Sequence, residues 1–411
     1  MKKMYKAMTA ALAALILLTS LLFSAAAAET SPSPIYSADD LFTSRDLTQE
    51  PDLSKAVSYT LTSGEDIHIT EAGTYVLTGT AENATVYVEA GKDDKVQLVL
   101  DGLTVANGSF PVIYAKTADK VFVTTTGDSA LSVTGSFTAD NDVKTDGVIF
   151  SKCDLVLNGA AKLTVVSTDN GIVCKDDLKI TGGEYQIQAS SKAVEANDSI
   201  RVKDGVLNLT AGADGLHAEN EDDNTLGYVY IGGGSITIQA GDDGIHATSV
   251  VQIDGGDLNI RAAEGIEATY VQLNGGSVNI QATDDGINAA KKSSAYTPTV
   301  EINGGDITVS MGQGDTDGID SNGNIIVNGG KIQVTGNSTF DYDGSAQYNG
   351  GTIIVNGQEV AYIPSQMMGG RGGFGGNGFG GNGFDGNGFN GGFNGGFGNN
   401  ENRGGRGGRG R

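Results

Sequence analysis

The chain has 411 residues, with 26 basic against 50 acidic side chains and a net charge of −24. Three lysines lie in the first 28 residues and five arginines after residue 366, which leaves 18 basic and 48 acidic residues between them. A body this negative repels nucleic acid and anionic membranes but attracts cations. There is no Trp, and no helical periodicity is sustained; apolar and polar residues alternate instead, which is typical of strands.

The first 28 residues have the layout of a secretory signal peptide: basic residues such as Lys2 and Lys3, an apolar run, and small residues up to Ala28. We therefore expect a secreted, extracellular protein that does not insert into a membrane after cleavage. An uncleaved anchor is the alternative, because the apolar run is near the lower limit for a membrane span. Residues 29–57 are expected to be a linker or an N-terminal cap.

Strands begin near Tyr59, and from about Asp146 a repeat becomes plain. One unit holds a strand such as SVNIQA, an acidic turn such as TDDG, a short strand INA, a further strand and a Gly-Gly turn. Most turn glycines recur 21 to 29 residues apart, and SKAVEA (191–196) fills one rung with Lys192–Ala193 in place of the acid–Gly pair. About three short strands per repeat indicate a solenoid. The pattern predicts an all-β, single-stranded parallel β-helix over residues 58–366.

The alternation assigns the faces of the strand that follows each acidic turn. The inward positions are Leu216, Ile245, Ile266, Ile287 and Ile319. The outward positions are His217, His246, Glu267, Asn288 and Asp320.

Acidic turn residues would stack about 4.8 Å apart on successive rungs, where their charges repel unless a cation neutralises them. Calcium suits this because it takes 6–8 oxygen ligands. Asp before Gly is also an ordinary turn residue, and the two histidines leave a transition-metal site as another alternative. The predicted calcium ligands are Asp214, Asp242, Asp243, Glu264, Glu267, Asp284, Asp285, Asp315, Asp317 and Asp320, with Asp343 continuing the column.

The strand before the acidic turn presents a polar, mostly uncharged outer face. Its outward positions are Gln186, Asn208, Thr237, Asn259, Asn279, Thr308 and Gln333, with Gln188, Gln239, Arg261 and Gln281 one step on. Such amides suit hydroxyl-rich polymers, but they also form ladders that stabilise stacked strands. The candidate sugar contacts are Asn259, Asn279 and Gln281, with Tyr270 and Tyr296 for ring stacking.

Cys153 and Cys174 lie 21 residues apart, about one rung, but two positions out of register. A disulfide and two separately packed thiols both remain open.

The run VQLVLDGLTV, together with SKAVEANDSIRV, ADGLHAENEDD, DDGIHA and EGIEA, resembles a bacterial extracellular family of carbohydrate-binding domain-containing proteins. The resemblance covers roughly residues 59–357. It implies a right-handed β-helix similar in shape to pectate lyases, binding of a cellulose-like or pectin-like (polygalacturonate-like) polysaccharide, and calcium held in the helix.

The function expected from these features is non-catalytic polysaccharide binding, without nucleic acid as a partner. One alternative is a calcium-dependent polysaccharide lyase, for which Arg261 would be the base. The other is an extracellular matrix or adhesion protein. The Gly-, Phe-, Asn- and Arg-rich tail, residues 367–411, is expected to be disordered and is a candidate for contact with the cell wall or cell surface.

Overall fold

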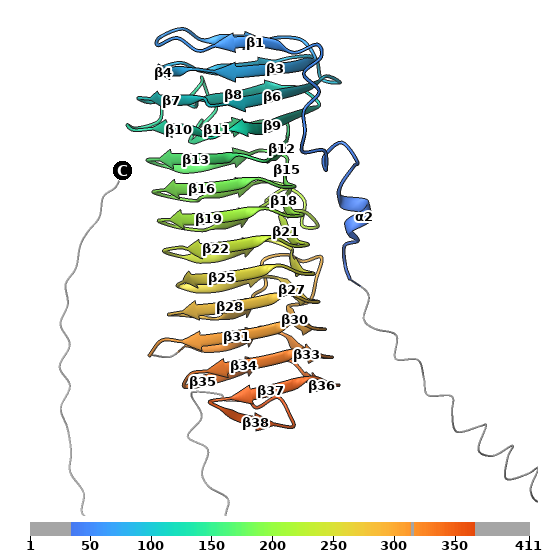
Figure 1. Ribbon diagram of the computed structural model, residues 1–411. Coiled ribbons are helices and arrows are strands. Elements are labelled where there is room, and N and C mark those ends of the chain that lie inside the picture. The colour runs from blue at the N-terminus through green and yellow to red at the C-terminus, as the bar shows by residue number, and fades with distance from the viewer. Residues whose placement is uncertain (1–33, 314–315, 366–411) are drawn as a thin grey trace, which may run out of the picture. The chain divides into compact units, whose positions relative to one another are not determined.

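The computed structural model describes residues 34–313 and 316–365. The predicted signal peptide, Asp315 and the Gly-rich tail lie outside the described residues. Among the residues it describes, no helix is long and apolar enough to cross a membrane. The one α-helix labelled in Figure 1, α2 (Ala38–Leu41), has four residues.

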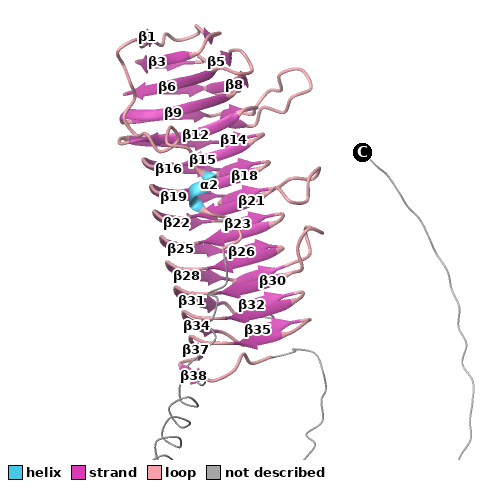
Figure 2. Cartoon of the chain, turned by 90° about the vertical axis from the view of Figure 1, so that its right-hand side faces the viewer, coloured by secondary structure: helices cyan, strands magenta, loops and turns pink. Residues whose placement is uncertain are grey.

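The described chain winds through three stacked parallel sheets, as Figures 1 and 2 show. From β3 to β35 each coil adds a strand to sheet 1, then to sheet 2, then to sheet 3. Sheets 1 and 2 have 13 strands each and sheet 3 has 12. The last pair in the described chain, β37 (Thr352–Val355) with β38 (Gln358–Val360), is antiparallel. The predicted all-β parallel β-helix is therefore confirmed.

Sheet 1 consists of β1 (Val57–Thr60), β3 (Gly73–Thr78), β6 (Lys95–Asp101), β9 (Lys120–Gly127), β12 (Asp154–Gly159), β15 (Asp177–Ile180), β18 (Ser199–Val202), β21 (Tyr228–Ile231), β24 (Val250–Ile253), β27 (Tyr270–Leu273), β30 (Thr299–Ile302), β33 (Asn324–Val327) and β36 (Ala346–Tyr348). Sheet 2 consists of β4 (Thr80–Glu82), β7 (Thr104–Asn107), β10 (Ser129–Val133), β13 (Lys162–Ser167), β16 (Glu184–Ala189), β19 (Val206–Ala211), β22 (Ser235–Gln239), β25 (Asp257–Ala262), β28 (Ser277–Ala282), β31 (Asp306–Met311), β34 (Lys331–Thr335), β37 and β38. Sheet 3 consists of β2 (Ile67–Ile69), β5 (Val86–Glu89), β8 (Ile113–Thr117), β11 (Gly147–Ser151), β14 (Asn170–Cys174), β17 (Val194–Ala196), β20 (Leu216–Ala218), β23 (Asp243–Ala247), β26 (Glu264–Ala268), β29 (Ile287–Ala289), β32 (Asp317–Ser321) and β35 (Ser338–Tyr342).

The interior is filled mainly by aliphatic side chains. At each inward position of a strand, one such side chain stacks on its counterpart in the next rung. Ile245, Ile266 and Ile287 pair in register in sheet 3 and are fully buried, as the alternation predicts. The stack continues into the N-terminal part of the chain, where Ile113 pairs with Ile149. The region before Thr145 therefore continues the same helix, with a longer excursion between these two rungs.

The turn glycines answer two different requirements. In the Gly-Gly turns the second glycine has a left-handed conformation, for example φ +84° at Gly276, which other residues adopt at a cost. In the acid–Gly turns the constraint is space, because a Cβ on Gly265 would lie 2.3 Å from the carbonyl oxygen of Gly286 and 2.4 Å from Ile280 Cγ2. The glycine of the acidic turn lets neighbouring rungs approach closely.

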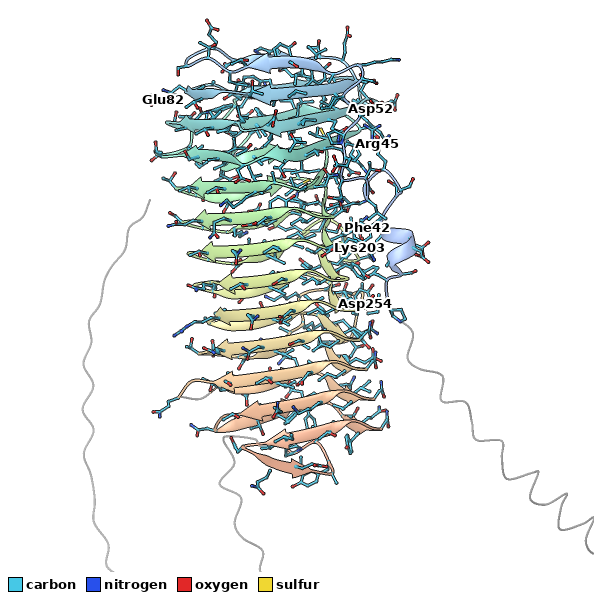
Figure 3. The ribbon with its side chains drawn as sticks, viewed as in Figure 1. Phe42, Arg45, Asp52, Glu82, Lys203 and Asp254 are labelled. Atoms are coloured by element: carbon cyan, nitrogen blue, oxygen red, sulfur yellow. The ribbon has the colours of Figure 1, made fainter. Side chains whose placement is uncertain are left out.

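Residues 34–56 form a strap along sheet 1 and do not close the end of the stack (Figures 1 and 2). The backbone NH of Tyr36 donates to Gln252 on β24, whereas the Gln49 side chain accepts from the backbone of Gly159 at the end of β12. Between them lies Phe42, which Figure 3 labels beside the stack. Its ring packs against that of Tyr230, with centroids 6.1 Å apart. The strap thus lies on the outer face of sheet 1 and contacts strands from β12 to β24 of that sheet.

Candidate functional site

The acidic turn residues lie on successive rungs where the chain enters sheet 3. Asp243 pairs directly with Glu264, and the same register joins Asp214, Asp243, Glu264, Asp285 and Asp317, which we call the acidic column. On the next rung Asp317 pairs with Ser338, so the prediction that Asp343 continues the column is wrong. The Asp343–Gly344 pair lies in the turn after β35. The column position of that rung is occupied by Ser338.

Part of each acidic turn has a structural role. One carboxylate oxygen of Asp214 accepts the backbone NH of Asp243 at 3.1 Å, and one of Asp285 accepts that of Asp317 at 3.0 Å. These bonds join one rung to the next and leave the second oxygen of each carboxylate for another partner. Asp242 and Asp284 stand beside the column and are exposed.

The outward residues of sheet 3 form a second, parallel row. The register confirms the predicted order His217, His246, Glu267, Asn288, Asp320. The row also includes Glu195 before His217 and Asp341 after Asp320, both missed from the sequence. Glu195 stands in SKAVEA, two residues after the position where the other turns have glycine, so its spacing could have identified it.

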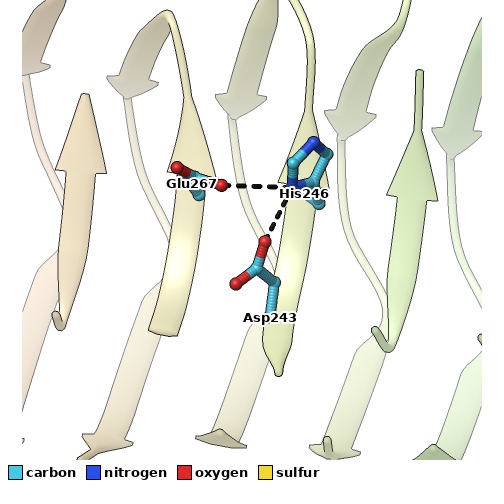
Figure 4. Close-up of side chains that lie close together, drawn as sticks. All are labelled: Asp243, His246 and Glu267. Carbon is cyan, nitrogen blue, oxygen red and sulfur yellow. Dashed lines mark hydrogen bonds and ion pairs between the residues drawn. The ribbon is translucent and has the colours of Figure 1, made fainter. Parts of the chain in front are cut away.

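The two rows meet around His246, as Figure 4 shows. His246 Nδ1 lies 2.7 Å from Asp243 Oδ2 and 3.2 Å from Glu267 Oε2, and all three residues are buried. The Lys292 ammonium lies 2.7 Å from the same Glu267 oxygen. We call Asp243, His246 and Glu267 the histidine group. Burial by itself would lower the pKa of His246, but the hydrogen bonds to Asp243 and Glu267 outweigh it and raise this pKa to about 9.

Towards the C-terminus the same rows hold oxygen ligands without a cationic partner. Burial, together with the neighbouring charge of Glu267, raises the pKa of Glu264 to about 7. Burial, reinforced by Asp285, raises the pKa of Asp320 to about 7, and burial raises that of Asp285 to about 6. Within the described ranges, the ion pairs of nearby lysines go to Glu195 and Glu267, and none reaches these three carboxylates.

The amide side chain of Asn288 lies next to one of these carboxylates. The Asn288 side chain donates to Glu264 Oε2 at 3.2 Å, and its buried Oδ1 has no hydrogen-bond partner. A buried acceptor without a partner is costly, and carboxylate and amide oxygens are the ligands calcium prefers. The oxygens of Glu264, Asp285, Asn288 and Asp320, here called the carboxylate group, are therefore ligands of the kind that calcium takes. The carboxylates of Asp243 and Glu267 differ from them, because His246 and Lys292 lie beside these two.

The polar face predicted for sugar contact is the outer face of sheet 2. Asn259 pairs with Asn279, and Arg261 pairs with Gln281 on the adjacent strands β25 and β28. Arg261 and Gln281 line a groove of about 450 Å³ at the edge of this face, together with Ser310 and Met311. The Asn279 to Asn259 bond is long, 3.3 Å, and Arg261 and Gln281 are exposed, so the face keeps donors and acceptors available to a ligand.

Tyr270 and Tyr296 lie elsewhere and do not join this face. Tyr270 lies on β27 of sheet 1, where its hydroxyl donates to Glu301 at 2.8 Å. The two rings pack edge to face, 6.1 Å apart, in the apolar patch that the strap covers. Tyr228 also lies in this patch, under Tyr36 at 4.3 Å. The tyrosines serve strap docking because they form part of an apolar patch on the outer face of sheet 1.

A structural ladder of amides was missed from the sequence. It stands at the turn from sheet 1 to sheet 2, immediately before the Gly-Gly pairs, and its side chains bond at 2.7–2.8 Å. Its members are Asp254, Asn274, Asn303, Asn328 and Asn349. The recurring Asn-Gly-Gly triplet was the signal that could have found it.

These features place the protein in the class of parallel β-helices with an acidic edge and a polar outer sheet. A sequence model of the carbohydrate-binding domain-containing protein family matches residues 63–317 and 267–361. The chain belongs to this family.

Individual relatives match parts of the chain. A carbohydrate-binding domain-containing protein of Acetivibrio thermocellus is 34% identical over 132 residues, which are 31% of this chain and 46% of the relative. The chain thus matches about half the length of that relative. A solved structure, described as a polysaccharide lyase-like protein from C. thermocellum in a gadolinium derivative, is 31% identical, with 52% of this chain and 92% of that chain covered and a TM-score of 0.49.

Proposed function

We propose that this protein is a secreted, non-catalytic polysaccharide-binding β-helix that holds its ligand on the outer face of sheet 2. The observation that carries the proposal is the open polar face of β25 and β28 in a member of a carbohydrate-binding family. Calcium in the carboxylate group is the cofactor we propose. A cellulose-like or polygalacturonate-like chain is the ligand.

The sheet 2 face suits an extended polymer. Outward side chains repeat along the stack at about 4.8 Å and along each strand at about twice 3.3 Å, so they present amide groups over a wide, flat area. Asn259 and Gln281 each offer both a donor and an acceptor, which matches sugar hydroxyls. The amide ladder between sheets 1 and 2 has shorter hydrogen bonds, such as the 2.8 Å bond from Asn328 to Asn303. The Asn279 to Asn259 bond, at 3.3 Å, lies at the exposed surface of sheet 2, where a ligand can reach both amides.

Calcium would act from the neighbouring edge. The carboxylate group and the groove lie on either side of the bend between sheets 2 and 3, because Glu264 follows Arg261 by three residues. An ion there neutralises the carboxylates that repel one another across rungs. The ion would also reduce the charge repulsion between a polyuronate chain and this strongly negative protein. A neutral cellulose chain is not repelled and needs no ion for binding.

A calcium-dependent lyase is the second candidate, favoured by one observation. Arg261 is exposed in the groove beside Gln281, and a base in a groove close to a cation is what uronate elimination needs. Formation of an unsaturated product from polygalacturonate, followed by ultraviolet absorbance, would establish this activity. An Arg261→Ala variant should then lose it while still binding the polymer.

Affinity electrophoresis tests the proposed function. The protein is run in native gels that contain hydroxyethyl cellulose, pectin or polygalacturonate, with calcium and again with a chelator. Retardation that needs calcium supports a site that the ion builds or bridges. Retardation that survives the chelator supports sugar binding by sheet 2 alone, with calcium as a structural ion. Full mobility in every gel would overturn the proposal and favour a matrix or adhesion protein.

A further inference from the structure

The histidine group has the geometry of a metal site as well as of an ion pair. The Asp243 and Glu267 oxygens lie 2.7 Å and 3.2 Å from His246 Nδ1, and the three ligand atoms lie within 4.8 Å of one another. Ligand atoms bound tetrahedrally at 2.0–2.2 Å stand about 3.3–3.6 Å from each other. Small side-chain movements would therefore place all three around one ion that bridges β23 and β26.

The donor set distinguishes this site from the proposed calcium site. His246 Nδ1 faces two carboxylate oxygens and carries at most one hydrogen, so one N–H must serve both acceptors. A divalent ion that displaces this hydrogen as a proton would satisfy the nitrogen and both oxygens together. Calcium prefers oxygen ligands only, whereas an imidazole nitrogen with two carboxylates suits zinc and similar ions. All three side chains are buried, so water competes little for the ligand atoms.

The neighbouring rung supplies an independent observation. His217 repeats the Asp-Gly-aliphatic-His arrangement, and its ring stacks on that of His246 with centroids 4.6 Å apart. Its Nδ1 lies 2.7 Å from Asp214 Oδ2, and its Nε2 lies 3.1 Å from Glu219 Oε2. Two successive rungs of sheet 3 thus each place an imidazole beside carboxylate oxygens.

Lys292 decides how tightly such an ion is held. Its ammonium contacts the same Glu267 oxygen that would bind the metal, at 2.7 Å, and its side chain is 29% exposed on the loop after β29. The ammonium and the ion cannot both use that oxygen at full strength. The lysine is free to swing into solvent, so it competes with the metal without blocking it.

From these contacts we infer that Asp243, His246 and Glu267 form a site for one zinc-class divalent ion, separate from the carboxylate group. The fourth position of the ion would be taken by water. Bound there, the ion joins two rungs of sheet 3. This inference stands independently of whether the protein binds a polysaccharide.

The test is titration of the full chain, without a histidine tag and stripped of metal, with Zn²⁺ in the presence of saturating calcium. Isothermal calorimetry should give one saturable zinc site, and Co²⁺ should give visible absorption bands of a low-symmetry site. His246→Gln should abolish both signals. Lys292→Ala, an exposed position that is not expected to disturb folding, should tighten zinc binding. Asp320→Asn is the matched control in the carboxylate group and should leave zinc binding unchanged.

The outcomes separate cleanly. No saturable zinc binding by the parent protein, or equal binding by folded His246→Gln, would overturn the inference. Displacement of zinc by calcium at comparable concentrations would assign the group to calcium instead and would equally overturn it. If His246→Gln does not fold, unchanged affinity of Lys292→Ala would contradict the assignment, because the lysine contacts the proposed ligand oxygen directly.

Discussion

The Asp46 carboxylate lies 2.9 Å from the ammonium of Lys179, although 133 residues separate them. Asp46 is fully buried, and its other oxygen lies 3.4 Å from Lys120. Burial alone would raise the pKa of Asp46, but the backbone NH of Thr43 and the Lys179 ammonium outweigh it and lower this pKa. The strap is thus held to sheet 1 by one buried acid and two lysines.

Replacement of this acid should loosen the strap. Asp46→Ala leaves the buried Lys179 without its partner, whereas Lys120 keeps its ion pair with Asp154. Breaking a buried pair from one side typically costs about 3–5 kcal/mol. We expect a lower Tm in thermal unfolding and faster hydrogen exchange in β9, β12, β15 and β18, the strands of sheet 1 that the strap contacts. Asp39→Ala, an exposed position on α2, is the matched control and should change neither. Equal behaviour of the two variants would show that the strap contributes little.

The raised pKa values of the carboxylate group predict an unusual pH dependence. Glu264 and Asp320 titrate in the folded protein at about 7, above the ordinary value of about 4 in the unfolded chain. A raised folded pKa gives stability that is complete below about pH 4 and is lost as the pH rises through about 7. We therefore expect the chelated protein to have a higher Tm at pH 5 than at pH 8.

Calcium should reverse that trend. Because the ion binds ionised carboxylates, it should raise the Tm more at pH 8 than at pH 5. Asp320→Asn should reduce both the pH slope of the chelated protein and the calcium effect. A calcium shift of the same size at both pH values, or none, would count against a site in the carboxylate group.

The Asn ladder should stabilise the turn between sheets 1 and 2. Asn303 donates to Asn274 at 2.7 Å and accepts from Asn328 at 2.8 Å, so Asn303→Ala removes two bonds and leaves partners unsatisfied. The expected loss is about 1–3 kcal/mol in the free energy of unfolding. Asn349→Ala removes one bond at the exposed end of the ladder and should cost less. Urea unfolding of the two variants gives the comparison.

The two cysteines should remain thiols. Both are buried and free, and Cys174 Sγ contacts the Cys153 carbonyl oxygen at 3.3 Å. Burial raises the pKa of Cys153 to about 11, so little reactive thiolate forms at neutral pH. A thiol reagent should label neither residue in the folded protein and both in denaturant. A mass that shows a disulfide in the purified protein would contradict this.

Much of the fold could be predicted because a parallel solenoid repeats one local rule. The Asp-Gly-Ile turns fixed both the inward stack of Ile245 and Ile266 and the outward row of His246 and Glu267. The position of the strap could not be predicted, since residues 34–56 have no repeat to align them and their docking depends on an apolar patch assembled from distant rungs. Tyr270 was predicted to contact sugar because its neighbours in space could not be read from the repeat. Its hydroxyl partner Glu301 lies on the next strand of sheet 1, and Tyr296 lies in a loop.

The candidate cation sites were predicted as one uniform column, and the structure divides them. Asp243 and Glu267 stand beside His246 and Lys292, whereas Glu264 and Asp320 stand beside other oxygens. This division depends on Lys292, which lies in a loop outside the repeat, and on the raised carboxyl pKa values that burial produces. Neither is visible in the spacing of the turns.

Affinity electrophoresis of two double variants shows whether sheet 2 holds the polysaccharide near β25 and β28. Asn259→Ala combined with Gln281→Ala removes two amides from the proposed face without changing the charge of the protein. Gln186→Ala combined with Gln188→Ala removes two exposed amides from β16, three strands away on the same sheet. We expect the first variant to lose retardation in the polysaccharide gel and the second to keep it, with equal mobility of all proteins in plain gels. Retention of full retardation by the first variant would contradict it.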